Sequence, residues 1–163
     1  MSTTEATVAY HLIYDAGAVG FHTWRWSMTG LIFVAVGAAP TIMVWRVRTS
    51  RARVFGRSFA LVLMLGSACW TASTYHAFRT EYRTLVDALA MHRYQLVEGV
   101  VVDYTPEGLG GHPWESWSVA GHHYTLSSSL VTSGFSEVGR VRLGQQVRIA
   151  DVNGSIARIE VAP

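Results

Sequence analysis

Three histidines near the C-terminal end of the sequence are the side chains best suited to metal binding. His112 lies in a glycine-rich stretch, whereas His122 and His123 are neighbours. Adjacent residues of a strand point to opposite faces, so His122 and His123 do not easily chelate one ion together. No Asp or Cys stands at a spacing that would complete a site of His112 with either of them. The one cysteine, Cys69, lies in an apolar stretch. We therefore expect no metal and no other cofactor.

Serines and acids offer a second possible chemistry, hydrolysis. Ser127, Ser128 and Ser129 follow the histidines, but the Gly-x-Ser-x-Gly turn that exposes a nucleophilic serine is missing. Glu98 and Asp103 are five apart on one expected strand, so they face opposite sides and make a poor acid–base pair. The sequence therefore favours a protein that is not an enzyme, with no catalytic residues to name.

The loop around His112 is the best candidate for binding a small ligand. Its glycines allow close approach of the backbone, and its tryptophans offer rings for stacking. The expected contacts are Gly110, His112, Trp114 and Trp117. An ordinary glycine-rich loop explains the same residues equally well.

Charge argues against nucleic acid as a partner. Residues 94–163 hold four arginines and seven acids, a balance of −3. A small β domain that binds nucleic acid needs a basic groove beside exposed aromatics. The aromatics are present, but the basic groove is not.

Two long apolar stretches determine where in the cell these candidate residues lie. Trp26–Trp45 and Ser58–Phe78 contain no charged residue, and each is long enough to cross a hydrocarbon core of about 30 Å. Small residues at four-residue spacing, such as Ala35 with Ala39 and Ser67 with Thr71, favour close packing of helices in lipid. We expect the two stretches to form a transmembrane hairpin, although the same faces suit a partner helix.

The arginines predict the direction of that hairpin. Five lie between the apolar stretches, against one in the first 25 residues and three in residues 79–93; the five are Arg46, Arg48, Arg51, Arg53 and Arg57. Short loops rich in Lys and Arg stay in the cytoplasm. The sequence thus predicts an inner-membrane protein of a bacterium with both termini outside the cytoplasm.

Beyond the second apolar stretch, the periodicity changes from helical to extended. Residues 79–93 continue as a helical stalk, and the valine-rich residues 94–106 are typical of a strand. Residues 116–120 and 123–127 flank Gly121 as a short hairpin, and residues 146–152 and 155–161 flank Asn153–Gly154, a strong hairpin signal. The fold class expected is α+β, with a small antiparallel SH3-like or OB-like barrel.

The predicted organisation has three parts. Residues 1–25 form an extracytoplasmic segment, and residues 26–93 form the hairpin with its cytoplasmic loop at 46–57 and its stalk at 79–93. Residues 94–163 form the extracytoplasmic β domain. If both termini are outside, residues 10–21 lie on the side of this domain, and we expect them to pack on it as an added strand.

Four motifs carry a resemblance: YDAGAVGF (14–21), VEGVVVDYTP (97–106), ESWSVAGHHYTLS (115–127) and VRIADVNGSIARIEV (147–161). In these the chain resembles a family of uncharacterised bacterial membrane proteins with a two-span anchor and an outer β domain. The resemblance implies a fold and carries over no catalytic residue.

Two functions remain open from the sequence. The first is an accessory or interaction subunit of a larger envelope complex, bound through its spans to a protein partner or to a second copy. The alternative is a sensor or effector whose outer domain binds a small ligand.

Overall fold

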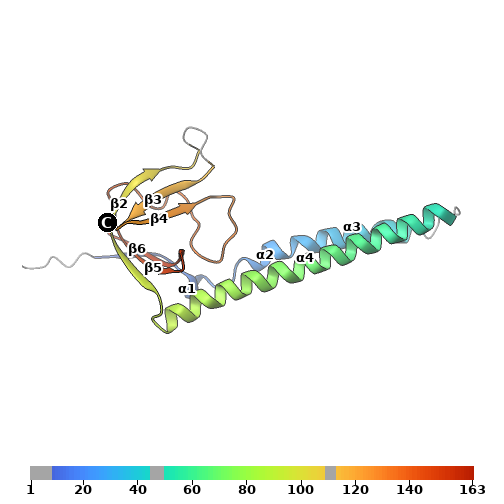
Figure 1. Ribbon diagram of the computed structural model, residues 1–163, viewed down its shortest axis with the longest axis horizontal. Helices are drawn as coiled ribbons and strands as arrows, with labels where there is room; N and C mark the ends of the chain where they lie inside the picture. Colours follow the sequence, from blue (N-terminus) through green and yellow to red (C-terminus); the bar gives the residue numbers. More distant parts are fainter. Residues whose placement is uncertain (1–8, 45–49, 109–112) are drawn as a thin grey trace, which may run out of the picture. The chain divides into compact units, whose positions relative to one another are not determined.

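The computed structural model describes residues 9–44, 50–108 and 113–163 (Figure 1). They divide into two compact units. The first unit combines Met1–Phe21 with Glu81–Pro163, and the second is His22–Thr80. The first unit is therefore assembled from both ends of the chain, and the second is formed by the middle.

The first unit is built on a six-stranded antiparallel sheet. Its order is β1-β6-β5-β2-β3-β4, so the strand from the N-terminal segment lies at one edge. The strands are β1 (His11–Asp15), β2 (Gln95–Thr105), β3 (Glu115–Val119), β4 (His122–Leu126), β5 (Gln146–Val152) and β6 (Ser155–Val161). The expected addition of the N-terminal segment as a strand is confirmed, because β1 pairs with β6.

Two tight turns account for both hairpins predicted from the sequence. Asn153 and Gly154 join β5 to β6 with φ of 54° and 84°, and Ala120 and Gly121 join β3 to β4 with φ of 48° and 82°. Two successive residues with positive φ define the turn whose twist matches that of paired strands. Alanine is an unusual residue for such a position, so the second turn carries some backbone strain.

The long strand β2 belongs to both halves of the sheet and lets one half fold over the other. Its first part pairs with β5 and its second part with β3, and its register shifts between Val102 and Thr105. At the crossing, a β-carbon on Gly99 would lie 3.3 Å from Cγ1 of Val119. Glycine therefore permits the close approach of β2 to the end of β3.

The sheet is open, and the predicted barrel does not close. Its two edges are β1 and β4. The chain that follows β4 lies beside the start of β6, where the Phe135 N–H donates to the Ile156 carbonyl at 3.0 Å. A β-carbon on Gly134 would lie 3.1 Å from the same carbonyl oxygen. This loop thus takes the hydrogen bond that a neighbouring strand would need to close a barrel.

The core of the first unit lies between the folded halves of the sheet and the last turns of α4 (Ser50–Ala90). Trp117, Ile149 and Ile159 are fully buried in the strands, and Leu85 of α4 is buried with them. Burial of such side chains is worth roughly 1.5–3 kcal/mol each, so α4 is part of the folding unit over its last turns. Thr132 fastens the loop after β4 to this helix, because its hydroxyl donates to Glu81 at 2.7 Å.

The C-terminal end of α4 is a Schellman motif. The Arg93 N–H donates to the Ala88 carbonyl at 2.8 Å, and the His92 N–H donates to the Leu89 carbonyl at 3.3 Å. His92 has a φ of 54°, at the position where glycine is usual. The helical stalk expected to about His92 therefore ends at Ala90. At its other end the helix begins at Ser50, inside the loop predicted at 46–57.

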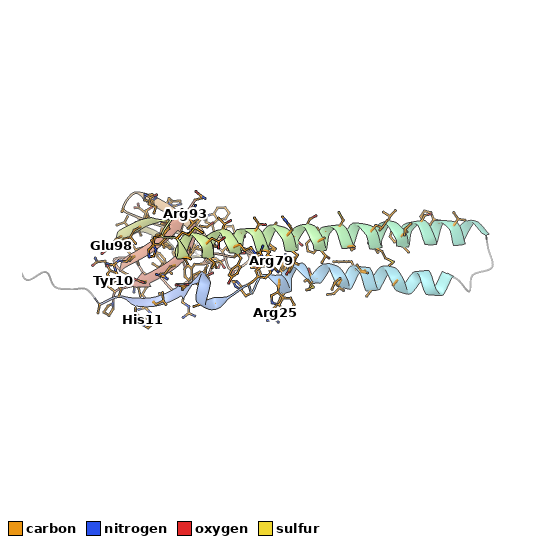
Figure 2. All side chains as sticks on the ribbon, turned by 90° about the horizontal axis from the view of Figure 1, so that it is seen from below. Tyr10, His11, Arg25, Arg79, Arg93 and Glu98 are labelled. Atoms are coloured by element: carbon orange, nitrogen blue, oxygen red, sulfur yellow. The ribbon has the colours of Figure 1, made fainter. Side chains whose placement is uncertain are left out.

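The second unit is helical and contains α2 (Trp24–Ser27), α3 (Thr29–Val44) and α4 as far as Thr80. Figures 1 and 2 show α3 lying alongside α4. Two glycines make the contact close: a β-carbon on Gly30 would overlap the Thr71 hydroxyl, and one on Gly37 would lie 3.0 Å from Cγ of Met64. Ala35, expected from its spacing to be in the contact, is exposed instead.

Among the described residues, one helix is long and apolar enough to cross a membrane. It is Val54–Ala90 of α4, whose most apolar window has a mean hydropathy of 1.4 with 6% of that window buried. The core helix of a soluble protein would be mostly buried. The structure thus establishes an α+β chain with one long apolar helix and a small antiparallel sheet.

Candidate functional site

The four residues predicted to contact a ligand do not gather at one described site. Gly110 and His112 lie outside the described residues. Trp114 is 47% exposed, whereas Trp117 is fully buried in β3 with its ring centroid 4.8 Å from that of Tyr124. Trp117 is therefore a core residue, and the loop site stays a prediction for Trp114 and its glycine-rich neighbours.

The two neighbouring histidines make separate contacts. Nε2 of His122 lies 3.2 Å from the side-chain nitrogen of Gln95, and Nδ1 of His123 lies 3.2 Å from the hydroxyl of Ser118. In the part of the chain that the structure describes, no three His, Cys, Asp or Glu side chains come together to hold a metal ion. His112, the third candidate, lies outside that part.

The serine run holds a loop in place. The hydroxyls of Ser127 and Ser128 each donate to Oε1 of Glu107 at 3.0 Å. The Ser128 N–H also donates to this carboxylate, at 3.1 Å. A carboxylate that accepts several hydrogen bonds from a turn is a structural tie, and no histidine takes part in these bonds.

A polar cavity of about 530 Å³ lies where β4 comes nearest to the ends of β2 and β5. We call it the seam pocket, because it lies along the edge at which the sheet stays open. Residues of the first unit alone line it. The polar side chains that line it are Arg93, Tyr94, Gln95, His122, His123, Tyr124, Asp151 and Asn153.

Asp151 is the buried acid of the seam pocket. It is 7% exposed, and its Oδ1 accepts a hydrogen bond from the Gly154 N–H at 2.8 Å, which holds the β5–β6 turn. None of the ion pairs among the described residues includes it. A buried charge is normally paired, because removing it from water is costly. Asp151 therefore brings to the cavity a carboxylate that has no ion-pair partner among the described residues.

Tyr124 lines the same cavity and carries a buried hydroxyl. Its side chain is 4% exposed, and the hydroxyl has no hydrogen-bond partner among the described residues. Burial raises the pKa of this phenol, and the negative charge of Asp151 raises it further. The two groups are thus near enough to interact. A buried hydroxyl without a partner costs about 1–3 kcal/mol, so the folded sheet retains it at a cost.

Arg93 supplies the positive charge of the seam pocket. Its N–H is a donor of the Schellman motif that ends α4, and Figure 2 shows Arg93 at that end of the helix. Its guanidinium contacts the sulfur of Met91 and forms none of the ion pairs found in the described ranges. The cavity therefore combines one arginine, one buried carboxylate and several other polar groups.

Sequence reasoning missed most of this site. It considered His122 only as a metal ligand and did not single out Arg93, Tyr124 or Asp151. These residues come from the segment after α4, from the edge strand β4 and from the end of β5, and no spacing in the sequence connects them. The available signal was local: Asp151 stands just before the Asn153–Gly154 turn, which a side-chain carboxylate often supports.

A second buried acid, Glu115, has a structural explanation. Its Oε2 accepts hydrogen bonds from the Gly139 N–H at 2.6 Å and from the Tyr104 hydroxyl at 3.1 Å. These bonds fasten β3 to β2 and to the long loop before β5. Its Oε1 has no partner among the described residues.

The second unit has an apolar groove of about 460 Å³ between α3 and α4. Gly30, Phe33, Val62, Gly66 and Trp70 line it. A β-carbon on Gly66 would meet no atom within 4 Å, so this part of α4 is open to a neighbour.

Comparison with known protein families, with characterised proteins and with solved structures finds no match to this chain. The resemblance seen in the sequence motifs therefore remains an expectation.

Proposed function

We propose that this chain is a two-span membrane protein whose outer β domain and spans act by binding. One observation carries the proposal: β1, which precedes the helices, pairs with β6, which follows them. The chain leaves the first unit at Phe21 and returns to it at Glu81. A segment that leaves a folded unit and returns to it crosses any membrane an even number of times. If α4 spans the bilayer, a second crossing must come from residues 22–49.

The length of the first helical stretch supports a second crossing. α2 and α3 are joined by Met28, whose backbone is itself helical with φ of −69° and ψ of −14°. Trp24–Val44 is then a nearly continuous stretch about 31 Å long at 1.5 Å per residue. This length matches the roughly 30 Å of the hydrocarbon core.

The arginine count supports the direction. Residues 46–57 hold five arginines without an acid, so we place this segment in the cytoplasm. The sheet and both termini then lie outside, at the inner membrane of a bacterium. Tryptophans at 24 and 26 suit the outer interface.

The biochemical role we propose is that of an accessory or interaction subunit in an envelope complex. The groove between α3 and α4 supports this role, since small residues and an exposed Trp70 are what a neighbouring helix packs against in lipid. The partner is a membrane protein or a second copy of this chain.

A second candidate role, a small-ligand sensor, is favoured by the seam pocket. Asp151 and Tyr124 are buried polar groups that lack full partners and line one cavity. Arg93, whose N–H bonds the Ala88 carbonyl at the end of α4, would connect a bound ligand to the end of the apolar helix.

Site-directed labelling of cysteines tests the membrane arrangement. In a Cys69→Ala background, Ser129→Cys tests the β domain and Thr49→Cys tests the arginine-rich segment. A membrane-impermeant maleimide should label position 129 in intact spheroplasts and position 49 only after permeabilisation. Labelling of both positions, or of position 49 alone, in intact spheroplasts would refute the hairpin.

Crosslinking in native membranes tests the role. After gentle detergent extraction, mass spectrometry should find a stoichiometric membrane partner whose crosslinks map to α3 or α4. Recovery of the chain as a monomer without partner would count against an accessory subunit and leave the sensor as the better proposal.

A further inference from the structure

The buried acid of the seam pocket forms no ion pair with any described residue. Asp151 accepts one hydrogen bond, from the Gly154 N–H, and belongs to none of the ion pairs of the described chain. A cationic group in the cavity would compensate this charge, and an ammonium is small enough to approach it. The buried acid thus indicates an amino group in the ligand.

Tyr124 adds a second acceptor for the same group. Tyr124 lines the cavity together with Asp151, and its buried hydroxyl oxygen has no hydrogen-bond partner among the described residues. An ammonium carries three donors, so it can bind the carboxylate and the hydroxyl at once. This contact would remove the cost of leaving the hydroxyl unsatisfied.

Arg93 provides for the opposite charge. The planar guanidinium of arginine binds carboxylates through paired hydrogen bonds. A ligand with an ammonium alone would leave this arginine unused, and a simple anion would face the charge of Asp151. A zwitterion can pair its ammonium with Asp151 and its carboxylate with Arg93, and it leaves the net charge of the cavity unchanged.

Cavity size limits the ligand. Small-molecule sites commonly have volumes of about 300–1,000 Å³, and the seam pocket falls in that range at about 530 Å³. A free amino acid or a short peptide fits this volume, and Gln95 and His122 on the walls offer further polar contacts.

We propose that the seam pocket binds a free α-amino acid or a short peptide, with the ammonium on Asp151 and Tyr124 and the carboxylate on Arg93. The inference builds on the sensor role proposed above. It does not depend on the orientation in the membrane, so the labelling experiment and the binding experiment can fail separately.

Calorimetric titration of the full chain in detergent micelles tests the proposal. The probes are the twenty standard amino acids and L-alanyl-L-alanine. Each is titrated to a concentration of about 10 mM, which is high enough to detect weak binding. At least one should bind saturably. Its N-acetylated form and its C-terminal amide should each bind at least about tenfold more weakly, because each lacks one of the two charges. Absence of saturable binding, or equal binding of the blocked forms, would overturn the proposal.

Two variants and one control locate the site. Tyr124→Phe removes the hydroxyl alone, and Arg93→Gln removes the charge of an exposed side chain. Each should weaken binding by about tenfold or more while the unfolding midpoint stays near that of the parent. Tyr14→Phe is the control, because Tyr14 is also a buried tyrosine of the first unit but donates to Ser133 and does not line the pocket. Binding that survives Tyr124→Phe and Arg93→Gln as it survives Tyr14→Phe would exclude the seam pocket as the site.

Discussion

Asp15 and Arg158 pair across the first and last strands of the sheet, with Nη2 of Arg158 2.6 Å from Oδ2 of Asp15. The same aspartate begins α1 (Ala16–Val19), because its Oδ1 accepts from the N–H groups of Gly17 and Ala18. One side chain therefore joins the N-terminal segment to the C-terminal strand and also starts the helix that leads away from β1.

Loss of this side chain should loosen the N-terminal strand. Asp15→Ala removes the cap and the ion pair, so we expect the free energy of unfolding to fall by about 1–3 kcal/mol. Asp15→Asn keeps a capping oxygen and should cost less. Urea unfolding of the full chain in detergent measures both variants.

The matched control is the exposed ion pair of Glu137 and Arg140. Glu137→Ala should change the free energy of unfolding by about 0.5 kcal/mol or less, because water screens such a pair. If Asp15→Ala lowered the free energy of unfolding no more than Glu137→Ala, the side-chain link between β1 and β6 would make no measurable contribution to stability.

Acid should weaken the attachment of Tyr10 next to β1. The Tyr10 hydroxyl donates to Glu98 at 2.7 Å, and Arg148 binds the same carboxylate at 2.9 Å; Figure 2 shows Tyr10 and Glu98 side by side. The hydrogen bond from Tyr10, followed by that from Arg148, lowers the pKa of Glu98. A lowered folded-state pKa stabilises the fold above the ordinary value near 4.5, and the stabilisation is lost as pH falls through the lowered value.

A comparison of the parent with Glu98→Gln at two pH values measures this effect. The difference in urea midpoint should be present at pH 7 and shrink toward pH 3. A difference that is the same at both pH values would show that the Glu98 charge has no role in holding Tyr10 and β1.

The two buried tyrosines of the first unit should respond differently to loss of their hydroxyls. Tyr14 donates to the Ser133 carbonyl at 2.8 Å, so Tyr14→Phe should cost about 1 kcal/mol or more, because the carbonyl loses its partner. Tyr124→Phe removes a hydroxyl without a partner, so the unfolding free energy should stay the same or rise. Equal losses in the two variants would mean that the Tyr124 hydroxyl is bonded in solution.

Local turn chemistry explains which parts of this fold the sequence could predict. The β5–β6 hairpin agrees with its prediction because Asn153 and Gly154 both adopt the positive φ that its turn requires. β2 was likewise expected from its valines and its end before Pro106. The open edge at β4 was not predictable, because it depends on the bond from Phe135 to Ile156, between residues far apart in the sequence.

The candidate site was less predictable than the fold for the same reason. Arg93, Tyr124 and Asp151 meet only after the sheet has folded over itself at Gly99. The sequence favoured Trp117 as a ligand contact because tryptophans are good stacking surfaces. Its place on β3 turns it into the core instead, since alternate residues of that strand are buried.

The C-terminal end of α4 should be improvable by one substitution. His92 adopts a φ of 54°, a conformation that costs about 1 kcal/mol for a residue with a β-carbon. His92→Gly should therefore raise the unfolding free energy by up to about 1 kcal/mol, whereas His92→Ala retains the β-carbon and should not. Chemical denaturation of both variants would decide, and a gain in the alanine variant would mean that the histidine ring, not the backbone, is the source of strain.

Substitution of the glycines of α3 should separate the two helices of the second unit. A β-carbon on Gly30 would overlap the Thr71 hydroxyl and lie 2.9 Å from Cε3 of Trp70. Gly30→Ala should therefore destabilise the helix pair by about 1–3 kcal/mol, the usual cost of overpacking. Gly66→Ala is the matched control, because its added methyl group meets open space and alanine favours helix.

Thermal loss of helical circular dichroism in detergent should occur at a lower temperature in Gly30→Ala than in Gly66→Ala. Identical melting of the two variants would show that α3 and α4 do not pack through Gly30 in solution, and the hairpin would then need a partner helix to hold it together.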